Sequence, residues 1–414
     1  MGDLDRYLFV PFFLFAFLIP IFLPASNGFL VLSIIAVLYK IDKERIRFNF
    51  KFFLTSTAVL FFAYLMGVFY TENPDRGINF LGRIATFLII PLVLGFNSKL
   101  DYAKVQRTMF YGLTIGLVLA CLYLLVNVFI GFMSAGDFSL RSLFSYRYTT
   151  QKFVLPLKES HPTYFGLYIL VCSIMWEFHN YRKLNKFKAV IYSIFLISLI
   201  FLNSRIIFIV AIIYALFFIF YKLKTRKQKA IVLLSGLILV SSVVYLIKDT
   251  YFVKKWERGV VWDLSDNVGN SNTTKKFVSD SRMARWKVAV SKYLEKPFFG
   301  YGTGMETTVL NKAYLENDMD FSHKKKYNAH NQYLNFLLEL GMLGLVIFIY
   351  FISINVFRSV KTKNHYQFLF LLFIMCISCT ENILVRNMGI TFFALFFNIS
   401  KLAFNNEEKQ IIDK

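Results

Sequence analysis

Long apolar runs alternate with short polar segments along most of this chain. The runs are uniformly hydrophobic and too long for the strands of a membrane barrel. Because a helix needs about 20 such residues to cross a bilayer, the pattern predicts an all-α integral membrane protein with about 12 transmembrane helices. The predicted helices lie near residues 7–24, 27–40, 52–70, 80–95, 108–132, 163–178, 189–203, 205–221, 230–247, 331–357, 366–382 and 388–404.

A polar stretch, residues 248–329, separates the ninth and tenth predicted helices. Loops of this length are usually functional or disordered. Its second half predicts an amphipathic helix over residues 282–293, which Pro297 ends. The following sequence, GYGTG at 300–304, lacks the Lys-Ser/Thr of a P-loop, so we interpret it as a turn that lets backbone segments approach. With a shorter polar loop at 133–162, the pattern predicts a single polytopic membrane domain over residues 1–414.

The distribution of basic residues along the chain predicts how this domain is oriented in the membrane. Hydrophobic residues make up 57% of the chain and the formal net charge is +22. The basic residues cluster in alternate loops, around 40–51, 99–107, 182–188, 222–229 and 358–363. Such clusters mark cytoplasmic loops. Both termini are therefore predicted to be cytoplasmic, and loops 133–162 and 248–329 to lie outside. Topology accounts for most of the positive charge, which argues against a nucleic-acid partner.

Cysteines and acidic residues offer little chemistry. All four cysteines lie in predicted membrane helices, so no disulfide framework is expected in the outer loops. No His pair or carboxylate cluster with metal-ligand spacing occurs on the outer side. We therefore expect no catalytic metal.

Arginines near the bilayer are candidate ligands for a phosphate group. Arg205 lies at the tip of the hairpin between the seventh and eighth predicted helices, and Arg83 lies about one turn inside the fourth. Charged residues are costly at such depths and often mark sites. The guanidinium fork donates two parallel bonds to phosphate oxygens. The alternatives are snorkelling for Arg205 and snorkelling or an ion pair for Arg83.

His330 begins the tenth predicted helix on the outer side and could accept a proton near neutral pH. The alternative is a structural role at the helix start. Glu339 lies nine residues later and would face the opposite side of a regular helix, so we expect it to pair with an arginine of another helix. Further candidate cavity residues are His161 and Tyr164, and Glu381 with Arg386, for which an ion pair is the simpler interpretation.

Several of these segments together resemble a known family. SRMARW at 281–286, PFFGYG at 297–302, HNQYL at 330–334 and LELG at 338–341, followed by Gly344, are similar to the signature region of the O-antigen ligase and polymerase superfamily. NSR at 203–205 resembles the arginine hairpin of that family. One departure is HPTY at 161–164, where many relatives have a Gly-Asn-Pro-Asn type of sequence.

The resemblance implies a glycosyltransferase of the bacterial inner membrane that acts on the periplasmic face without metal, ATP or another cofactor. Its donor would be an undecaprenyl-diphosphate-linked glycan. His330 would match the essential histidine of the family, and Arg205 and Arg282 its diphosphate-contacting arginines, whereas Arg285 falls at a position expected to vary.

The acceptor and the reaction class stay open at this point. A ligase, which we slightly favour, would use a sugar hydroxyl of lipid A-core. An O-antigen or exopolysaccharide polymerase would use a second lipid-linked repeat. A secondary transporter or flippase would also fit about 12 helices with basic inner loops. However, a large outer loop after the ninth helix fits two equal halves poorly.

Overall fold

A computed structural model of the chain describes residues 7–44, 46–158, 160–179, 182–265, 268 and 280–412. Throughout these residues the regular secondary structure is helical, apart from two isolated antiparallel bridges between Ile41 and Ser98 and between Phe48 and Phe96. The predicted all-α class is confirmed.

Each predicted membrane segment coincides with a helix or with two consecutive helices. In the first half of the chain these are α2 (Val10–Leu18), α3 (Leu23–Tyr39), α4 (Phe50–Phe53) with α5 (Ala58–Val68), α6 (Pro74–Arg83) with α7 (Thr86–Gly95), α8 (Tyr102–Ala135) and α11 (Pro162–Phe178). In the second half they are α12 (Lys188–Leu202), α13 (Arg205–Lys222), α14 (Arg226–Leu246), α19 (Gln332–Lys361), α20 (His365–Ser378) and α21 (Asn387–Ile412).

Fewer than 12 of these helices are long enough to cross a bilayer by themselves. By length and composition, six described segments qualify, in α8, α12 with the turn before it, α13, α14, α19 and α21. The pair α6 and α7, bent by 48°, would add a seventh as a broken span. By contrast, α5 has 11 residues, roughly 17 Å of helix against a hydrocarbon core of about 30 Å. The structure fits a membrane protein, and the number of 12 transmembrane helices stays a prediction.

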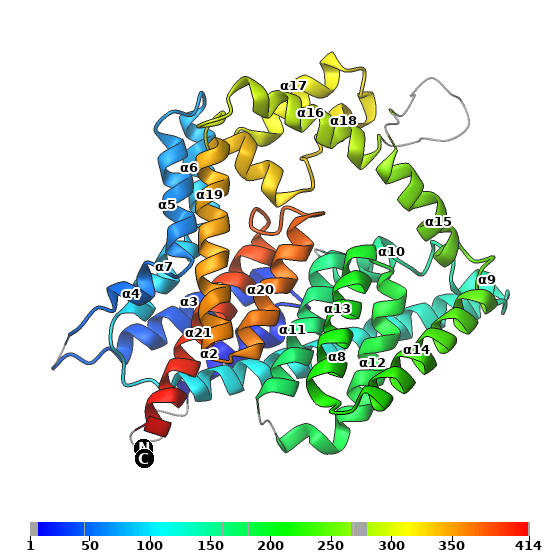
Figure 1. The fold of residues 1–414 in the computed structure, drawn as a ribbon, viewed down its shortest axis with the longest axis horizontal. Coiled ribbons are helices and arrows are strands. Elements are labelled where there is room, and N and C mark those ends of the chain that lie inside the picture. Colours follow the sequence, from blue (N-terminus) through cyan, green and yellow to red (C-terminus); the bar gives the residue numbers. More distant parts are fainter. Residues whose placement is uncertain are drawn as a thin grey trace. The chain divides into compact units, whose positions relative to one another are not determined.

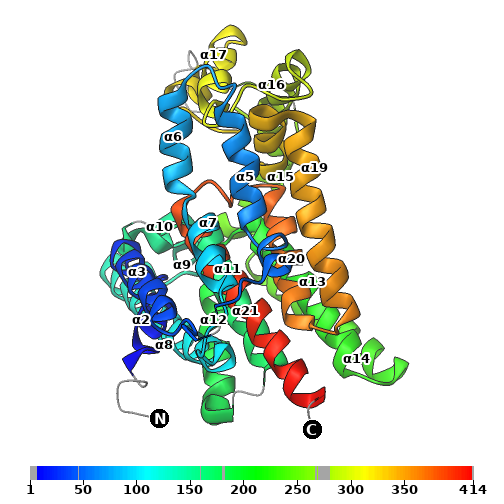
Figure 2. The same ribbon diagram turned by 90° about the vertical axis from the view of Figure 1, so that its left-hand side faces the viewer.

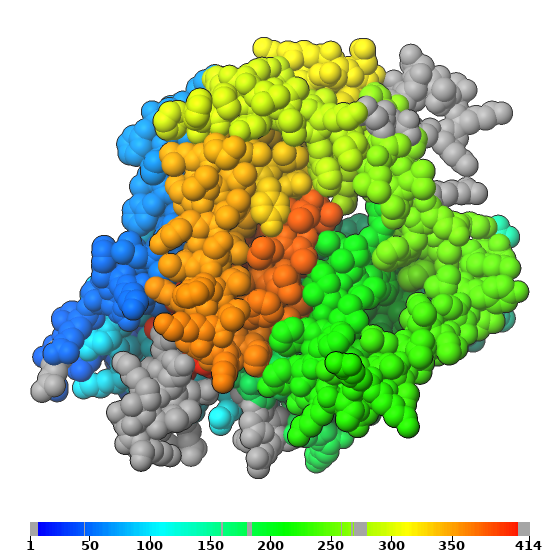
Figure 3. Space-filling view, in the orientation of Figure 1, coloured from blue at the N-terminus to red at the C-terminus, as the bar shows by residue number. Residues whose placement is uncertain are grey.

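Apolar side chains remain exposed on the candidate membrane helices. None of the residues of α14 is buried. On α19, Val346, Ile349, Tyr350 and Phe357 are exposed, on the helix that Figure 3 draws in orange. Exposed apolar surfaces of this extent are typical of lipid or protein contact, which supports the membrane assignment.

The chain divides into two compact units. Unit 1 comprises residues 1–15, 24–109 and 262–414, and unit 2 comprises residues 16–23 and 110–261. Helices α8 and α15 (Tyr251–Leu264) each contribute to both units. The single polytopic membrane domain stays a prediction.

In unit 1 the long helix α19 packs against α5 and α20, while α7 packs against α21. Figure 2 shows α5 between α6 and α19. The helices α16 (Arg282–Glu295), α17 (Glu306–Glu316) and α18 (Asp320–Lys325), here called the loop helices, lie at the N-terminal end of α19 (Figure 1). They have a small core of their own that includes Ala289, Leu310, Tyr314 and Leu338 of α19. The start of α19 is therefore held by packed helices.

The loop of residues 248–329 is largely ordered where it is described. Ser281 caps α16, since its Oγ accepts from the backbone N–H of Ala284 at 3.1 Å. The helix matches the predicted amphipathic segment and ends at Glu295, with Lys296 as its C-cap immediately before Pro297. Residues 266–267 and 269–279 of this loop lie outside the described part.

In unit 2, α11 is buried along almost its whole length and packs against α12 and α13. The predicted loop 133–162 carries three short helices, α9 (Leu140–Leu143), α10 (Gln151–Val154) and η1 (Leu155–Leu157). The hairpin between α12 and α13 turns at Asn203, whose φ of +43° is left-handed.

Candidate functional site

His330 lies immediately before α19 and is not the residue that caps it. The N-cap is Asn331, whose Oδ1 accepts from the backbone N–H groups of Tyr333 (2.9 Å) and Leu334 (3.2 Å). His330 itself has a left-handed φ of +49°, a strained conformation for a non-glycine residue. Its N–H donates to Asn328 Oδ1 at 3.1 Å. Strain of this kind is typical of functional sites, so a structural cap no longer explains this histidine.

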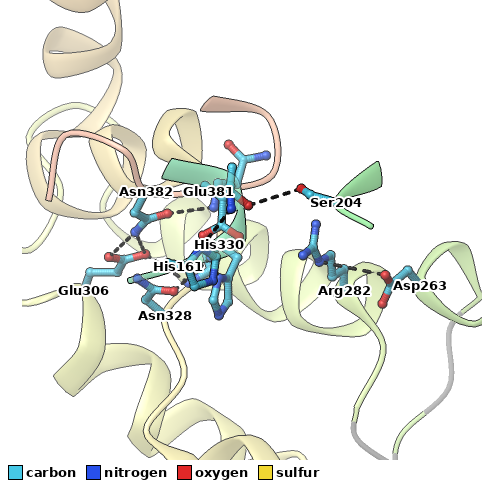
Figure 4. A network of polar contacts seen from close by, with 12 residues as sticks. His161, Ser204, Asp263, Arg282, Glu306, Asn328, His330, Glu381 and Asn382 are labelled. Carbon is cyan, nitrogen blue, oxygen red and sulfur yellow. Dashed lines mark hydrogen bonds and ion pairs between the residues drawn. The ribbon is translucent and has the colours of Figure 1, made fainter. Parts of the chain in front are cut away.

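The imidazole of His330 faces a carboxylate. Nδ1 lies 3.4 Å from Oε2 of Glu381, and the two side chains are 17% and 6% exposed. Burial lowers the pKa of His330 from its usual value of 6.5, Glu381 raises it, and Arg285 and Arg282 lower it further. Because the net shift is downward, the ring is neutral at pH 7 and able to accept a proton. Figure 4 shows His330 beside Glu381.

A buried acid that the sequence did not indicate, Glu306, holds the chain on both sides of His330. Its carboxylate accepts from Ala329 N (3.0 Å), from Asn335 Nδ2 (2.8 Å) and, at both oxygens, from Asn382 Nδ2 (3.0 and 2.8 Å). Asn382 Oδ1 in turn accepts from Asn331 N at 2.7 Å (Figure 4). Ala329 and Asn331 flank His330, so Glu306 positions this segment. Its only sequence signal was an acid in the first turn of a helix, which is common.

Glu339 is buried in unit 1. We expected it to pair with an arginine, but no arginine among the described residues bonds to its carboxylate. Instead, Oε1 accepts from the backbone N–H of Glu306 at 3.4 Å, while Oε2 has no hydrogen-bond partner there. Glu306 is the first residue of α17, where helix N–H groups are free and the helix dipole is positive. A helix N-terminus therefore takes the place of the arginine that we predicted.

The glycine-rich turn approaches α19 as the sequence predicted. The N–H groups of Tyr301 and Gly302 donate to the carbonyls of Leu338 and Glu339, both at 2.8 Å. These carbonyls lie just before a break in α19 at Gly341, where φ is +64° and ψ −160°. A Cβ on Gly341 would meet the backbone of Phe298. Glycine is needed at this break because two backbone segments touch there.

Two arginines of α16 lie near His330. Arg282 is partly exposed, with Nε 3.9 Å from Asp263 Oδ2 (Figure 4). Arg285 is only 6% exposed and lies over the ring of Tyr327 at 5.0 Å. Its Nε and Nη1 have no hydrogen-bond partner in the described part of the chain. We expected position 285 to vary and gave it no role. The sequence feature that could have indicated a role for Arg285 is its i, i+3 spacing from Arg282, which places both arginines on one face of the helix.

Arg83 and Arg386, also in unit 1, have less defined surroundings. Arg83 ends α6 and lies over the ring of Phe80 at 5.8 Å, exposed to solvent. Arg386 makes no ion pair in the described residues, so the interpretation of Glu381 with Arg386 as an ion pair is wrong. Glu381 pairs with His330 because the turn after α20 brings it to the start of α19.

The remaining candidates belong to unit 2. His161 is the N-cap of α11, its Nδ1 accepting from Thr163 N at 3.4 Å, and its ring contacts the buried Tyr164. Arg205 is the first residue of α13, and its Nη1 would lie 3.4 Å from a Cβ at Gly259. Gly259 lines a cavity of about 440 Å³ whose wall also includes Arg141, Lys254, Lys255 and Asp249. Arg205 therefore lies beside a cavity with a basic wall.

The structure thus brings His330, Glu381, Arg282 and Arg285 together in unit 1. Glu306 bonds to the residues next to His330, and Glu339 accepts from the backbone N–H of Glu306. Arg205, His161 and Tyr164 lie in unit 2, and within the described part of the chain neither Arg83 nor Arg386 contacts His330. Within the described residues, no three His, Cys, Asp or Glu side chains are grouped so that they could hold a metal ion.

One comparison with known proteins gives a match. Residues 190–349 match a protein-family model described as O-Antigen ligase. The matched segment contains Arg205, Arg282, His330 and Glu339, and ends before Glu381. No curated protein matches the sequence.

Proposed function

We propose that this chain is a glycosyltransferase of the bacterial inner membrane, and the match of residues 190–349 to the O-Antigen ligase family model supports this proposal. It moves a glycan from undecaprenyl diphosphate to a sugar hydroxyl of lipid A-core. The observation that carries the proposal is the buried pair of His330 and Glu381, at 3.4 Å, in which His330 lies inside the matched segment and Glu381 lies after it in the sequence.

In the proposed reaction His330 is the general base. Because Nδ1 faces Glu381, Nε2 is the nitrogen left for the acceptor hydroxyl. The hydroxyl oxygen attacks the anomeric carbon of the donor while its proton passes to Nε2. The anomeric C–O bond breaks, and its electron pair leaves with undecaprenyl diphosphate. Glu381 holds the ring and stabilises the imidazolium that forms, as a carboxylate does beside a histidine base.

Arginines bind the diphosphate and stabilise the charge that develops on it. Arg282 is the first of these in unit 1, with Arg285 one turn further along α16. Arg205 of unit 2 is the other arginine that the family resemblance assigns to the diphosphate, and it lies beside a cavity with a basic wall. Arg83 is a more distant candidate at the end of α6. The chemistry balances without a metal ion or cofactor, because the arginines supply the positive charge.

The alternation of basic loops supports an active site on the periplasmic face, cytoplasmic termini and a 12-helix polytopic domain. Loops 133–162 and 248–329 would then form the periplasmic part. The donor lipid would reach the site through the membrane, and nucleic acid is not a partner.

A polymerase acting in polysaccharide biosynthesis is the alternative, with a second lipid-linked repeat as acceptor. The two are distinguished by lipopolysaccharide gels from a strain in which the gene is deleted. Loss of all capped chains is expected for a ligase. Caps of a single repeat would instead identify a polymerase, and unchanged lipopolysaccharide together with normal extracellular polysaccharide would refute both.

A further inference from the structure

A second polar cavity lies in unit 1 at the opposite end of α19 from His330. It has a volume of about 270 Å³ and is formed by residues near α4, the last turns of α19, the start of α20 and the end of α21. α19 has 30 residues, roughly 45 Å of helix, so this cavity is separate from the His330 site. Nothing in the proposed transfer reaction uses it.

Three cationic side chains line the cavity. Lys401 is only 7% exposed, and its Nζ donates to Thr55 O (2.6 Å), Thr55 Oγ1 (2.6 Å) and Asn355 Oδ1 (3.0 Å). Arg358 donates from Nη1 to the same Thr55 Oγ1 at 2.7 Å. Lys51 lies at the exposed edge. Two cations thus share one hydroxyl oxygen.

Among the residues whose side chains the structure describes, which on α21 end at Phe404, no acidic residue compensates these charges. The cavity wall contains no Asp or Glu, and neither Lys401 nor Arg358 forms an ion pair with a described residue. Burying a cation without a counter-charge is costly. The remaining nitrogens of Arg358 make no hydrogen bond to described residues, so they are available to a ligand.

The start of α20 forms part of the cavity wall. Gln367, the third residue of this 14-residue helix, lines the cavity. The backbone N–H of Gln367 already donates to Asn364 Oδ1 at 3.0 Å, so the helix start contributes only the partial positive charge of its dipole. The rest of the wall is mainly neutral and polar, and the side-chain NH₂ of Asn49 is able to donate to anion oxygens, whereas the hydroxyls of Ser359 and Thr362 already donate to backbone carbonyls.

We propose that this cavity binds a phosphate group. Arg358 would hold it through its two-pronged guanidinium, and Lys401 and Lys51 would supply charge. The charge pattern predicts that this end of α19 faces the cytoplasm. The phosphate therefore comes either from an anionic phospholipid of the inner leaflet or from free phosphate in solution.

The test uses the full-length protein in nanodiscs of phosphatidylcholine. Binding of phosphatidylglycerol is measured by native mass spectrometry after exchange into discs that contain it, and binding of inorganic phosphate by calorimetry. Arg358→Gln is the main variant, because Arg358 is half-buried and its loss leaves Lys401 bonded to Thr55 and Asn355. Lys361→Gln is the matched control, since Lys361 is exposed on the same helix end and does not line the cavity.

We expect wild type to bind either phosphatidylglycerol or inorganic phosphate, and Lys361→Gln to bind the same ligand with the same affinity. Arg358→Gln should bind that ligand at least about tenfold more weakly, because it loses one charge-assisted contact. Selective retention of phosphatidylglycerol identifies a lipid headgroup, and binding of inorganic phosphate alone identifies a free anion. If wild type binds neither ligand, or if Arg358→Gln binds as wild type does, the proposal is wrong. Transfer activity is not a readout here, so this result is independent of the proposed function.

Discussion

Replacing Glu306 by glutamine tests whether this buried acid holds the His330 segment. The wild-type carboxylate accepts from Ala329 N, Asn335 Nδ2 and Asn382 Nδ2. Glutamine has one oxygen and one NH₂ group, and the NH₂ cannot accept. Whichever way the amide is turned, its NH₂ faces a donor, either Ala329 N or Asn335 Nδ2.

The magnitude follows from this geometry. One buried donor is left without a partner, which costs about 1–3 kcal/mol. Asn382 reaches both carboxylate oxygens, so it also loses one of its two contacts. If the cost falls on local opening of the segment around Ala329, the backbone N–H groups there should exchange roughly 5- to 150-fold faster, at a factor of ten for each 1.4 kcal/mol.

Hydrogen–deuterium exchange of the purified protein, read on peptides that cover residues 325–335, is the assay. Glu316→Gln is the matched control, because Glu316 is an exposed acid of the same helix and, among the described residues, its side chain pairs only with Lys292, at 3.3 Å. We expect faster exchange around residue 329 in Glu306→Gln and unchanged exchange there in Glu316→Gln.

Equal exchange of these peptides in Glu306→Gln and wild type would refute the positioning role. A general acceleration over all of unit 1 would mean that Glu306 supports the fold as a whole and not this segment. If the role is correct and His330 is the base, Glu306→Gln should lower the turnover of glycan transfer more than it changes donor binding.

Four further predictions concern topology and the site. Leu315 is 57% exposed on α17, and a cysteine in its place should react with an impermeant thiol reagent in cells with a permeabilised outer membrane. Labelling only after lysis of the inner membrane would show that the predicted orientation is wrong. Replacing Arg205 or Arg282 by alanine should lower glycan transfer, and replacing either by lysine should restore only part of it, because an ammonium cannot make the two-pronged contact. Full activity of both alanine variants at normal protein levels would exclude diphosphate binding by these arginines. His330→Ala should reduce turnover by roughly 10²–10⁴-fold. In wild type, turnover should fall as the pH drops through a pKa below 6.5, since burial lowers the pKa of His330. Glu381→Gln should move this inflection to lower pH, because Glu381 raises that pKa, and an unchanged profile would contradict the pairing.

Helix positions and the membrane class could be predicted because they depend on local pattern. A run of apolar residues indicates a buried or lipid-facing helix wherever it packs, and each predicted segment carries a helix. The amphipathic helix α16 and the turn at 300–304 were predictable for the same reason. The cap at Ser281, the end before Pro297 and the glycines with positive φ are all short-range effects.

The partners of the candidate residues depended on contacts between distant segments. Glu339 was expected to meet an arginine, but the start of α17, more than 30 positions earlier in the sequence, supplies a helix N-terminus instead. Glu381 was paired with Arg386 on grounds of proximity in sequence, whereas the fold brings it to His330, 51 positions away. Glu306 had no distinctive pattern, because its role consists of hydrogen bonds to residues 23, 29 and 76 positions away.

The sequence by itself predicted a helical protein with helices of the kind that cross membranes, and its motifs indicated a resemblance to the O-antigen ligase and polymerase superfamily and drew attention to His330, Arg205 and Arg282. Only the tertiary structure decided how His330 is held: by Glu381 at its ring and by Glu306 through the residues on either side. The physical reason is that apolar periodicity and turn chemistry act over a few residues. The pairing of a buried polar group is decided by whichever donors and acceptors the packed helices bring within about 3 Å of it.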